Sequence, residues 1–205
     1  EEADYVCLFN WAGTKKYGTK LAETVFRKVK SKGRGKTYYD TADPKPNIAG
    51  VPGLIQQILK TPNVDILSLN ENEAIIYAGC FEKKDSEKPR KASLSQLALE
   101  SARILVRHLP SRIDLHTTDF SATLNSKSEV IFPVFDVKPI RATGAGDAWN
   151  AGNIFADANA LSDKCRLALA NAVSACYISD PEGKHPTPQR LAKFIESVDF
   201  PFLRA

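Results

Sequence analysis

The feature that most constrains the fold is a regular alternation of short β-rich runs with longer helical stretches. Residues 5–9 (YVCLF) are almost continuously apolar, which is typical of a strand buried on both faces of a sheet. Residues 16–30 then place their apolar side chains on one helical stripe. This alternation predicts a three-layer α/β/α arrangement, with a mostly parallel sheet covered by helices on both faces.

The same alternation continues through the rest of the chain. Strands are expected at residues 36–40, 64–69 and 112–117, and helices from residue 52 and at 95–107, 146–159, 163–179 and 188–198. Residues 121–124 and 130–135 flank an N-S-K-S turn and predict a hairpin, which Pro133 places at the sheet edge. The length suits one core, so residues 1–205 are interpreted as a single α/β domain.

Composition excludes several classes of function. Lysine and arginine outnumber aspartate and glutamate by 28 to 24, a small and dispersed excess that does not indicate a nucleic-acid partner. No stretch approaches the roughly 20 apolar residues that span a bilayer, so no membrane partner is expected. The four cysteines lack C-x-x-C spacing, which favours buried, reduced thiols over disulfides. Together these features predict a cytoplasmic protein.

The most informative segment is residues 141–152 (RATGAGDAWNAG). Small residues lead into a predicted helix, where open backbone N–H groups and the helix dipole create an anion hole. Asp147 lies in the first turn, where its carboxylate can accept a proton from a hydroxyl group. A base beside an anion hole suits phosphoryl transfer to an alcohol. A tight glycine turn, with Asp147 only stabilising the helix start, is the alternative.

Two competing phosphate-binding motifs do not fit the sequence. The P-loop string G-x-x-x-x-G-K-[ST] does not occur, and the dinucleotide fingerprint would need a glycine where Trp149 stands.

Residues 143–149 (TGAGDAW), together with Gly152, resemble the C-terminal signature of the ribokinase-like (PfkB) carbohydrate and nucleoside kinases. Residues 70–73 (NENE), which follow a predicted strand, resemble the N-x-x-E motif of the same family. The likeness covers essentially the whole chain and implies a ribokinase-like fold. It also implies that the N-terminal lid portion lies outside these residues, so that the chain is the C-terminal two-thirds of a longer kinase.

The resemblance assigns roles to individual residues. Asp147 would be the catalytic base that activates the acceptor hydroxyl, and Gly144, Ala145 and Gly146 would form the anion hole. Asn70 and Glu73 would position Mg²⁺ and phosphates through water, with a helix cap as the alternative. Further nucleotide contacts are expected from Thr118, Asp119, Ala122, Thr143, Asn171 and Gly183.

The resemblance also implies the substrates. The donor would be a purine nucleotide, ATP, with ADP left open. The acceptor would be a small-molecule sugar, polyol or nucleoside, and a homodimer is an open alternative because such kinases commonly dimerise through the lid.

Three segments depart from the family pattern. Arg141 stands where relatives have an aspartate that helps to form a monovalent-cation site. Its guanidinium could supply fixed positive charge near the phosphates instead, with a solvent-facing arginine as the alternative. Residues 117–122 (TTDFSA) replace a T-x-G-x-x-G loop, which keeps open a non-catalytic regulator that binds nucleotide or sugar. Asp40, Asp43 and Lys45 match the acceptor-contacting segment D-x-N-x-R only loosely, and turn chemistry explains Asp43 equally well.

Overall fold

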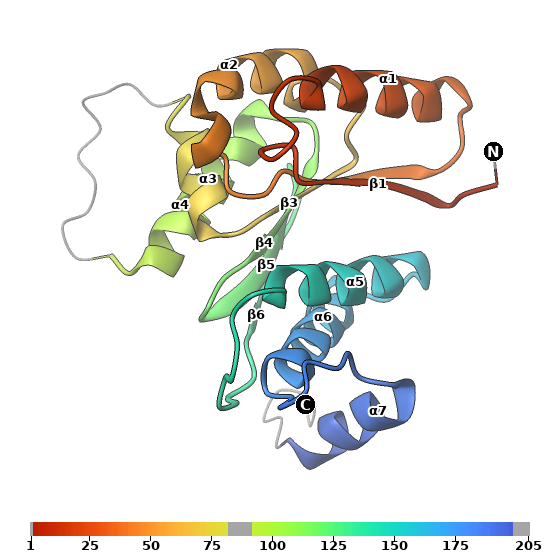
Figure 1. Cartoon of the computed structure of the whole chain (residues 1–205), viewed down its shortest axis with the longest axis vertical. Helices are drawn as coiled ribbons and strands as arrows, with labels where there is room; N and C mark the ends of the chain where they lie inside the picture. Colours follow the sequence, from red (N-terminus) through yellow and green to blue (C-terminus); the bar gives the residue numbers. More distant parts are fainter. Residues whose placement is uncertain (1, 82–91, 199–205) are drawn as a thin grey trace. The chain divides into compact units, whose positions relative to one another are not determined.

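The computed structural model describes residues 2–81 and 92–198. Its sheet has six strands in the order of the sequence, and β1 to β4 are parallel while β5 is antiparallel to β4 (Figure 1). The strands are β1 (Tyr5–Phe9), β2 (Lys36–Asp40), β3 (Ile66–Leu69), β4 (Arg112–His116), β5 (Phe120–Leu124) and β6 (Glu129–Pro133). The predicted parallel sheet and its edge hairpin, β5–β6, are therefore confirmed.

The helices follow the predicted stretches within a few residues. Four of them begin at a residue whose side chain accepts a hydrogen bond from the first turn: Asn70, Ser93, Ser162 and Thr187. The helical segments are α1 (Gly18–Ser31), the 3₁₀ segment η1 (Lys45–Gly50), α2 (Val51–Leu54), the π-helical segment η2 (Ile55–Leu59), α3 (Glu71–Ala78), α4 (Leu94–His108), α5 (Ala145–Ala158), α6 (Asp163–Ile178) and α7 (Pro188–Ser197).

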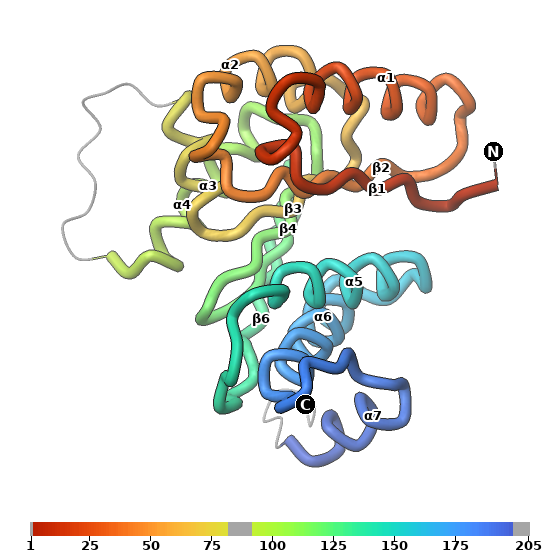
Figure 2. Tube along the Cα trace, viewed as in Figure 1, coloured from red at the N-terminus to blue at the C-terminus, as the bar shows by residue number. Residues whose placement is uncertain are grey.

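The chain forms two compact units, which we call unit 1 (up to residue 131) and unit 2 (from residue 132). In unit 1, α1 packs on β1 and β2, and α4 packs on β4 and β5 (Figure 2). One continuous apolar core joins these helices to the sheet, with Phe26, Leu67, Leu105 and Leu115 fully buried in it. Helices α1 to α4 thus cover one face of the sheet.

Unit 2 is built on a close crossing of α5 and α6. A Cβ atom at Gly152 would lie 2.9 Å from the Cα of Ala170, so only glycine allows this approach. Helix α7 adds an apolar layer, in which Phe194 packs edge-on against Phe135 with ring centroids 5.1 Å apart. This crossing fixes the start of α5, where the candidate site lies.

Two expectations about burial are wrong. Strand β1 is the outermost of the described strands, and its residues are half-buried, with Phe9 47% exposed, rather than buried on both faces. The four cysteines are free thiols, as expected, but Cys80 and Cys165 are exposed at the ends of helices rather than buried. No helix in residues 2–81 or 92–198 is both long and apolar enough to cross a membrane.

Candidate functional site

The N-terminus of α5 is open, as the sequence predicts. Gly144 is the N-cap residue, with φ 85° and ψ 0°, and no side chain caps the helix. The N–H of Ala145 donates to the carbonyl of Ala142 at 3.1 Å, so Ala145 is not a free donor. Within the described chain no group accepts a hydrogen bond from the N–H of Gly146 or Asp147. These two N–H groups and the helix dipole form a receptor for an anion.

Two side chains from α6 hold this loop in place. Ser174 Oγ donates to the carbonyl of Ala145 at 3.1 Å, and Tyr177 Oη donates to the carbonyl of Thr143 at 3.2 Å. Neither residue is predicted from the sequence. Their spacing of three places them on one face of a helix, but only the fold shows that this face meets the loop. A Cβ atom at Gly144 would lie 2.6 Å from Tyr177 Oη, so this contact also requires glycine.

Asp147 lies in the first turn of α5 and its side chain is exposed. It makes no hydrogen bond or ion pair with another residue in the described ranges. The carboxylate therefore stands beside the open N–H groups and is available to a substrate. The predicted base, Asp147, and the predicted anion-hole residues are consecutive at the start of α5, and their roles stay predictions.

Arg141 and Gly183 also meet in unit 2. The Arg141 guanidinium donates to the carbonyl of Pro181 at 2.9 Å and lies over the ring of Tyr177, 5.8 Å from its centroid. Gly183 has φ 71°, and a Cβ atom there would collide with the guanidinium.

Asn171 takes part in internal packing. It is 4% exposed, its Oδ1 accepts from Trp149 Nε1 at 2.8 Å, and its Nδ2 donates to the carbonyl of Pro133 at 2.9 Å. The amide thus ties α5 and α6 to the end of β6. Both polar atoms of the amide are thus already used inside the protein, and the expected nucleotide contact of Asn171 stays a prediction.

In unit 1, Asn70 and Glu73 form a complete capping box at the start of α3. Asn70 Oδ1 accepts from Glu73 N at 3.1 Å, and Glu73 Oε2 accepts from Asn70 N at 3.0 Å. Glu73 Oε1 also accepts from Asn70 Nδ2 at 2.8 Å. The helix cap that the sequence offered as an alternative is therefore present.

Glu73 is nonetheless an unusual capping residue because its side chain is buried. Burial raises the pKa of Glu73 to about 8, and repulsion from Asp40, Asp43 and Glu71 acts in the same direction. Only the N–H of Asn70 lowers it. A cation beside Glu73 would relieve the repulsion among these carboxylates and favour the ionised form of Glu73.

The expected acceptor contacts form local turns. Asp40 Oδ1 accepts from the N–H of Ala42, which has φ 56°, and Asp43 Oδ1 accepts from the N–H of Lys45. Asp43 and Lys45 remain exposed. Since Asp40 ends β2 and Asn70 follows β3, these side chains lie at the carboxyl edge of the parallel strands, where ligands bind in such sheets.

The segment expected to contact nucleotide after β4 is a tight turn. Thr118 N donates to Glu71 Oε1 at 2.7 Å, and Thr118 and Asp119 are exposed at the same edge of the sheet. Ala122 is a correction to the sequence interpretation. It lies in β5, opposite Leu115, and is fully buried in the apolar core, because the turn ends and β5 begins at Phe120.

No group of three or more His, Cys, Asp or Glu side chains in residues 2–81 and 92–198 is placed to hold a metal ion. The oxygen donors near Glu73 are of the type that Mg²⁺ prefers. Such an ion would keep several waters and take its remaining ligands from phosphate, which is its usual mode.

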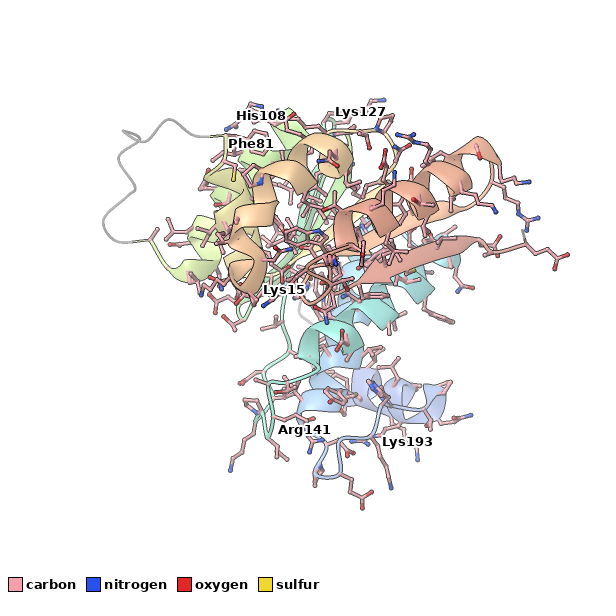
Figure 3. All side chains as sticks on the ribbon, turned by 45° about the horizontal axis from the view of Figure 1, so that its top comes forward. Lys15, Phe81, His108, Lys127, Arg141 and Lys193 are labelled. Atoms are coloured by element: carbon pink, nitrogen blue, oxygen red, sulfur yellow. The ribbon has the colours of Figure 1, made fainter. Side chains whose placement is uncertain are left out.

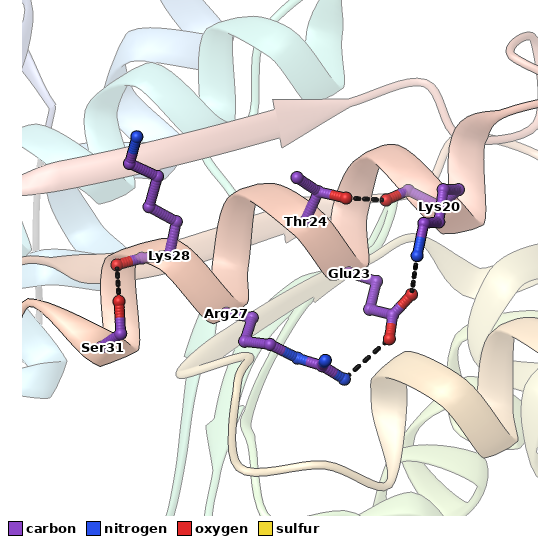
Figure 4. Close-up of a pocket in the computed structure, with 6 residues that line it drawn as sticks. All are labelled: Lys20, Glu23, Thr24, Arg27, Lys28 and Ser31. Carbon is purple, nitrogen blue, oxygen red and sulfur yellow. Dashed lines mark hydrogen bonds and ion pairs between the residues drawn. The ribbon is translucent and has the colours of Figure 1, made fainter.

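Two surface hollows carry no comparable chemistry. One runs along α1, where Glu23 accepts from Lys20 and Arg27, so it consists of exposed ion pairs of little energy (Figure 4). The other is an apolar hollow in unit 2, and its lining does not suit a phosphate. It is lined chiefly by Phe132, Phe135, Leu161, Ala168, Leu169 and Ile195.

No protein-family model and no curated protein sequence matches this chain. Solved structures do. One is an E. coli protein provisionally named ribokinase II, in complex with ATP and Mg²⁺, with 13% identity, a TM-score of 0.72, and coverage of 95% of this chain and 59% of that one. Another is aminoimidazole riboside kinase from Salmonella enterica, with 19% identity, a TM-score of 0.70, and coverage of 94% and 63%.

Adenosine kinase from Sinorhizobium meliloti matches at 17% identity with a TM-score of 0.72, covering 95% of this chain and 54% of that one. The chain thus spans less than two-thirds of the length of these structures. Their likeness confirms the fold that the T-G-A-G-D and N-x-x-E motifs indicated: the chain has the ribokinase-like α/β fold of sugar and nucleoside kinases.

Proposed function

We propose that this chain carries the catalytic part of a phosphotransferase, which moves the terminal phosphoryl group of ATP to a hydroxyl group of a sugar or sugar-like acceptor. The observation that carries the proposal is the open N-terminus of α5, with the carboxylate of Asp147 in its first turn. The structures of similar fold are sugar and nucleoside kinases, which supports kinase activity in general.

In the proposed reaction, Asp147 accepts the proton of the acceptor hydroxyl as that oxygen bonds to the γ-phosphorus. The bond from phosphorus to the bridging oxygen breaks, and ADP leaves with its electron pair. The N–H groups of Gly146 and Asp147 stabilise the charge on the transferring group through the dipole of α5. The exposed side chain of Asp147 allows the acceptor to approach.

By the family resemblance, the carboxyl edge of unit 1 would hold hydrated Mg²⁺. Asn70 and Glu73 would orient the waters around the ion, and Thr118 and Asp119 would line the same edge. When bound, Mg²⁺ supplies neutralisation of the phosphate charge. Without such a cation, the acidic side chains around Glu73 would repel an anion at this edge.

The acceptor is a sugar, a polyol or a nucleoside, and two structures of similar fold, aminoimidazole riboside kinase and adenosine kinase, favour testing nucleosides beside sugars. A non-catalytic regulator that binds nucleotide or sugar is the second candidate. The observation that favours it is the tight turn at Thr118 and Asp119, which places a carboxylate where a glycine loop is expected.

The proposal is tested with Asp147→Asn, which keeps the size of the side chain but removes the base. Turnover of ATP and of ADP is measured against a panel of sugars, polyols and nucleosides, and binding of both nucleotides by calorimetry. A positioned general base contributes about 10²–10⁴ in rate, so turnover should fall by that factor while ATP still binds. Asp136→Asn is the matched control, because Asp136 is an exposed aspartate of unit 2 outside α5.

Near-normal turnover in Asp147→Asn would refute the role of Asp147. Nucleotide binding without turnover on any acceptor, in the unaltered protein, would favour the regulator. Cleavage of ATP that is unaffected by either variant would indicate another site.

A further inference from the structure

The Arg141 guanidinium is held in a fixed place beside the anion-binding loop. It donates to the carbonyl of Pro181 at 2.9 Å, lies over the ring of Tyr177, and packs against Gly183. Arg141 is therefore not a freely solvated arginine, although its side chain is only half-buried.

The turn that receives the guanidinium is itself braced. Asp180 Oδ1 accepts from the N–H groups of Glu182 and Lys184, at 2.8 and 3.0 Å, and its other oxygen pairs with Arg190 of α7. Gly183, at φ 71°, allows the chain to pass close to the guanidinium. A braced turn keeps the Pro181 carbonyl aimed at Arg141.

Arg141 is connected to the anion-binding loop through one side chain. The Tyr177 ring lies under the guanidinium, and its hydroxyl donates to the carbonyl of Thr143, next to Gly144. The ring also stacks on His185, with centroids 4.6 Å apart. The positive charge is thus held one aromatic ring away from Thr143 and Gly144, which lead into α5.

A monovalent cation does not fit at this position. The resemblance implies an aspartate here, which would help to form a monovalent-cation site. In this chain the guanidinium takes the Pro181 carbonyl and fills the space against Gly183, and its own charge repels a second cation. No described carboxylate is recorded as pairing with Arg141 to offset that repulsion.

We propose that the Arg141 guanidinium is a built-in replacement for a monovalent cation, so that ATP binding at the start of α5 does not depend on potassium or sodium. Arg141 is a positioning residue: it fixes the 180–183 turn and Tyr177 against the loop and adds to the positive potential of α5. This inference rests on the proposed function, because it concerns the same anion-binding loop.

The test compares potassium chloride, sodium chloride and tetramethylammonium chloride at one ionic strength. ATP affinity and the melting temperature of the unliganded protein are measured in each salt. The variants are Arg141→Gln, which removes the charge, and Arg141→Asp, which supplies a carboxylate beside the Pro181 carbonyl. Lys193→Gln is the matched control, because it removes one charge from an exposed position of unit 2 (Figure 3).

In the unaltered protein we expect ATP affinities in the three salts to agree within about twofold. Arg141→Gln should weaken ATP binding by more than about tenfold in every salt, while Lys193→Gln should not. Arg141→Asp should bind ATP weakly in tetramethylammonium and regain affinity specifically in potassium or sodium. A merely structural arginine would not produce this salt-specific recovery.

The proposal is overturned if potassium tightens ATP binding to the unaltered protein by about tenfold or more, if Arg141→Gln binds ATP normally, or if Arg141→Asp responds equally to all three salts. If ATP binds to no variant in any salt, the proposed function fails. The melting temperatures still decide the inference, because a cation bound only to the folded protein raises the melting temperature. We expect potassium or sodium, but not tetramethylammonium, to raise the melting temperature of Arg141→Asp. None of the three salts should raise the melting temperature of the unaltered protein in this specific way.

Discussion

Helices α3 and α5 begin in opposite ways. At α3, Asn70 and Glu73 cap the first turn with their own side chains, and Glu73 is buried. At α5, the N-cap is Gly144, no side chain caps the turn, and Asp147 is exposed. Both segments carry the sequence signature of a helix start with an acidic residue in the first turn.

The difference shows how the same local chemistry serves two purposes. A capped N-terminus has its donors satisfied within the protein, so it can hold a carboxylate in place but has little left for an external anion. An N-terminus opened by a left-handed glycine keeps its donors for a ligand. We therefore propose that α5 receives the transferring phosphoryl group and that α3 orients hydrated cations.

Gly144→Ala should break the open start of α5 and have the largest effect. The left-handed backbone costs a non-glycine residue about 1–3 kcal/mol, and the new Cβ would also displace Tyr177. We expect ATP affinity to fall more than about tenfold, the equivalent of 1.4 kcal/mol. Calorimetry and urea unfolding measure both effects.

Gly33→Ala is the control for backbone strain alone. Gly33 also has a positive φ, 65°, but a Cβ there would meet no atom within 4 Å. It should lose some stability and keep ATP binding. Equal loss of ATP affinity in both variants would contradict the role given to the Gly144–Tyr177 contact.

Glu73→Gln tests the buried glutamate at the start of α3 through the pH dependence of the unfolding free energy. Because burial raises the pKa of Glu73 to about 8, the folded protein holds a proton there that the unfolded chain releases at lower pH. This contribution to stability is complete below the ordinary glutamate pKa of about 4.3 and is lost as pH rises through 8. Glutamine carries no charge, so the variant should be the more stable protein at pH 9.

At pH 9 the unfolding free energies of Glu73→Gln and the unaltered protein should differ by more than about 1.4 kcal/mol, the free energy of one pKa unit. This difference should shrink toward pH 5. Urea unfolding across this range measures it. Glu100→Gln is the control, because Glu100 is an exposed glutamate of unit 1. Parallel pH profiles for the unaltered protein and Glu73→Gln would show that Glu73 titrates normally.

Asn70→Ala should have the smallest effect. It removes the acceptor for the N–H of Glu73, and losing such a cap costs about 0.5–2 kcal/mol. Ser93→Ala removes the matching acceptor from the capping box of α4 and provides the comparison. Unchanged unfolding free energy in Asn70→Ala would mean that the cap at α3 does not hold the helix start.

Most of the fold could be predicted from the sequence because local signals agree with the tertiary structure. Apolar runs marked the strands, Pro188 after Thr187 marked α7, and Pro133 marked the sheet edge. The exposed β1 could not be predicted, since an apolar run does not reveal how many neighbours a strand has. The 3₁₀ segment η1 also lacked a signal, because its Pro and Asn residues equally suit a turn.

The site was predictable where its residues are consecutive. The conformation of the segment from Thr143 to Asp147 is determined by its own residues. The small residues before the helix were therefore enough to predict the open loop. Tyr177 and Asp180 could not be found this way, because they reach the loop and Arg141 only through the crossing of α5 and α6 and the turn that follows. Ala122 shows the opposite case. Its position in a sequence motif predicted a nucleotide contact, but it is buried in the apolar core.

The most direct test of the central claim is a nuclear magnetic resonance titration of the amide-labelled protein with ATP in the presence of EDTA. We expect the largest shifts at the amides of Gly146 and Asp147, whose N–H groups have no acceptor in the described chain. The amide of Glu73, which already donates to Asn70, should barely move. Shifts concentrated at Glu73, with none at Gly146 and Asp147, would contradict it.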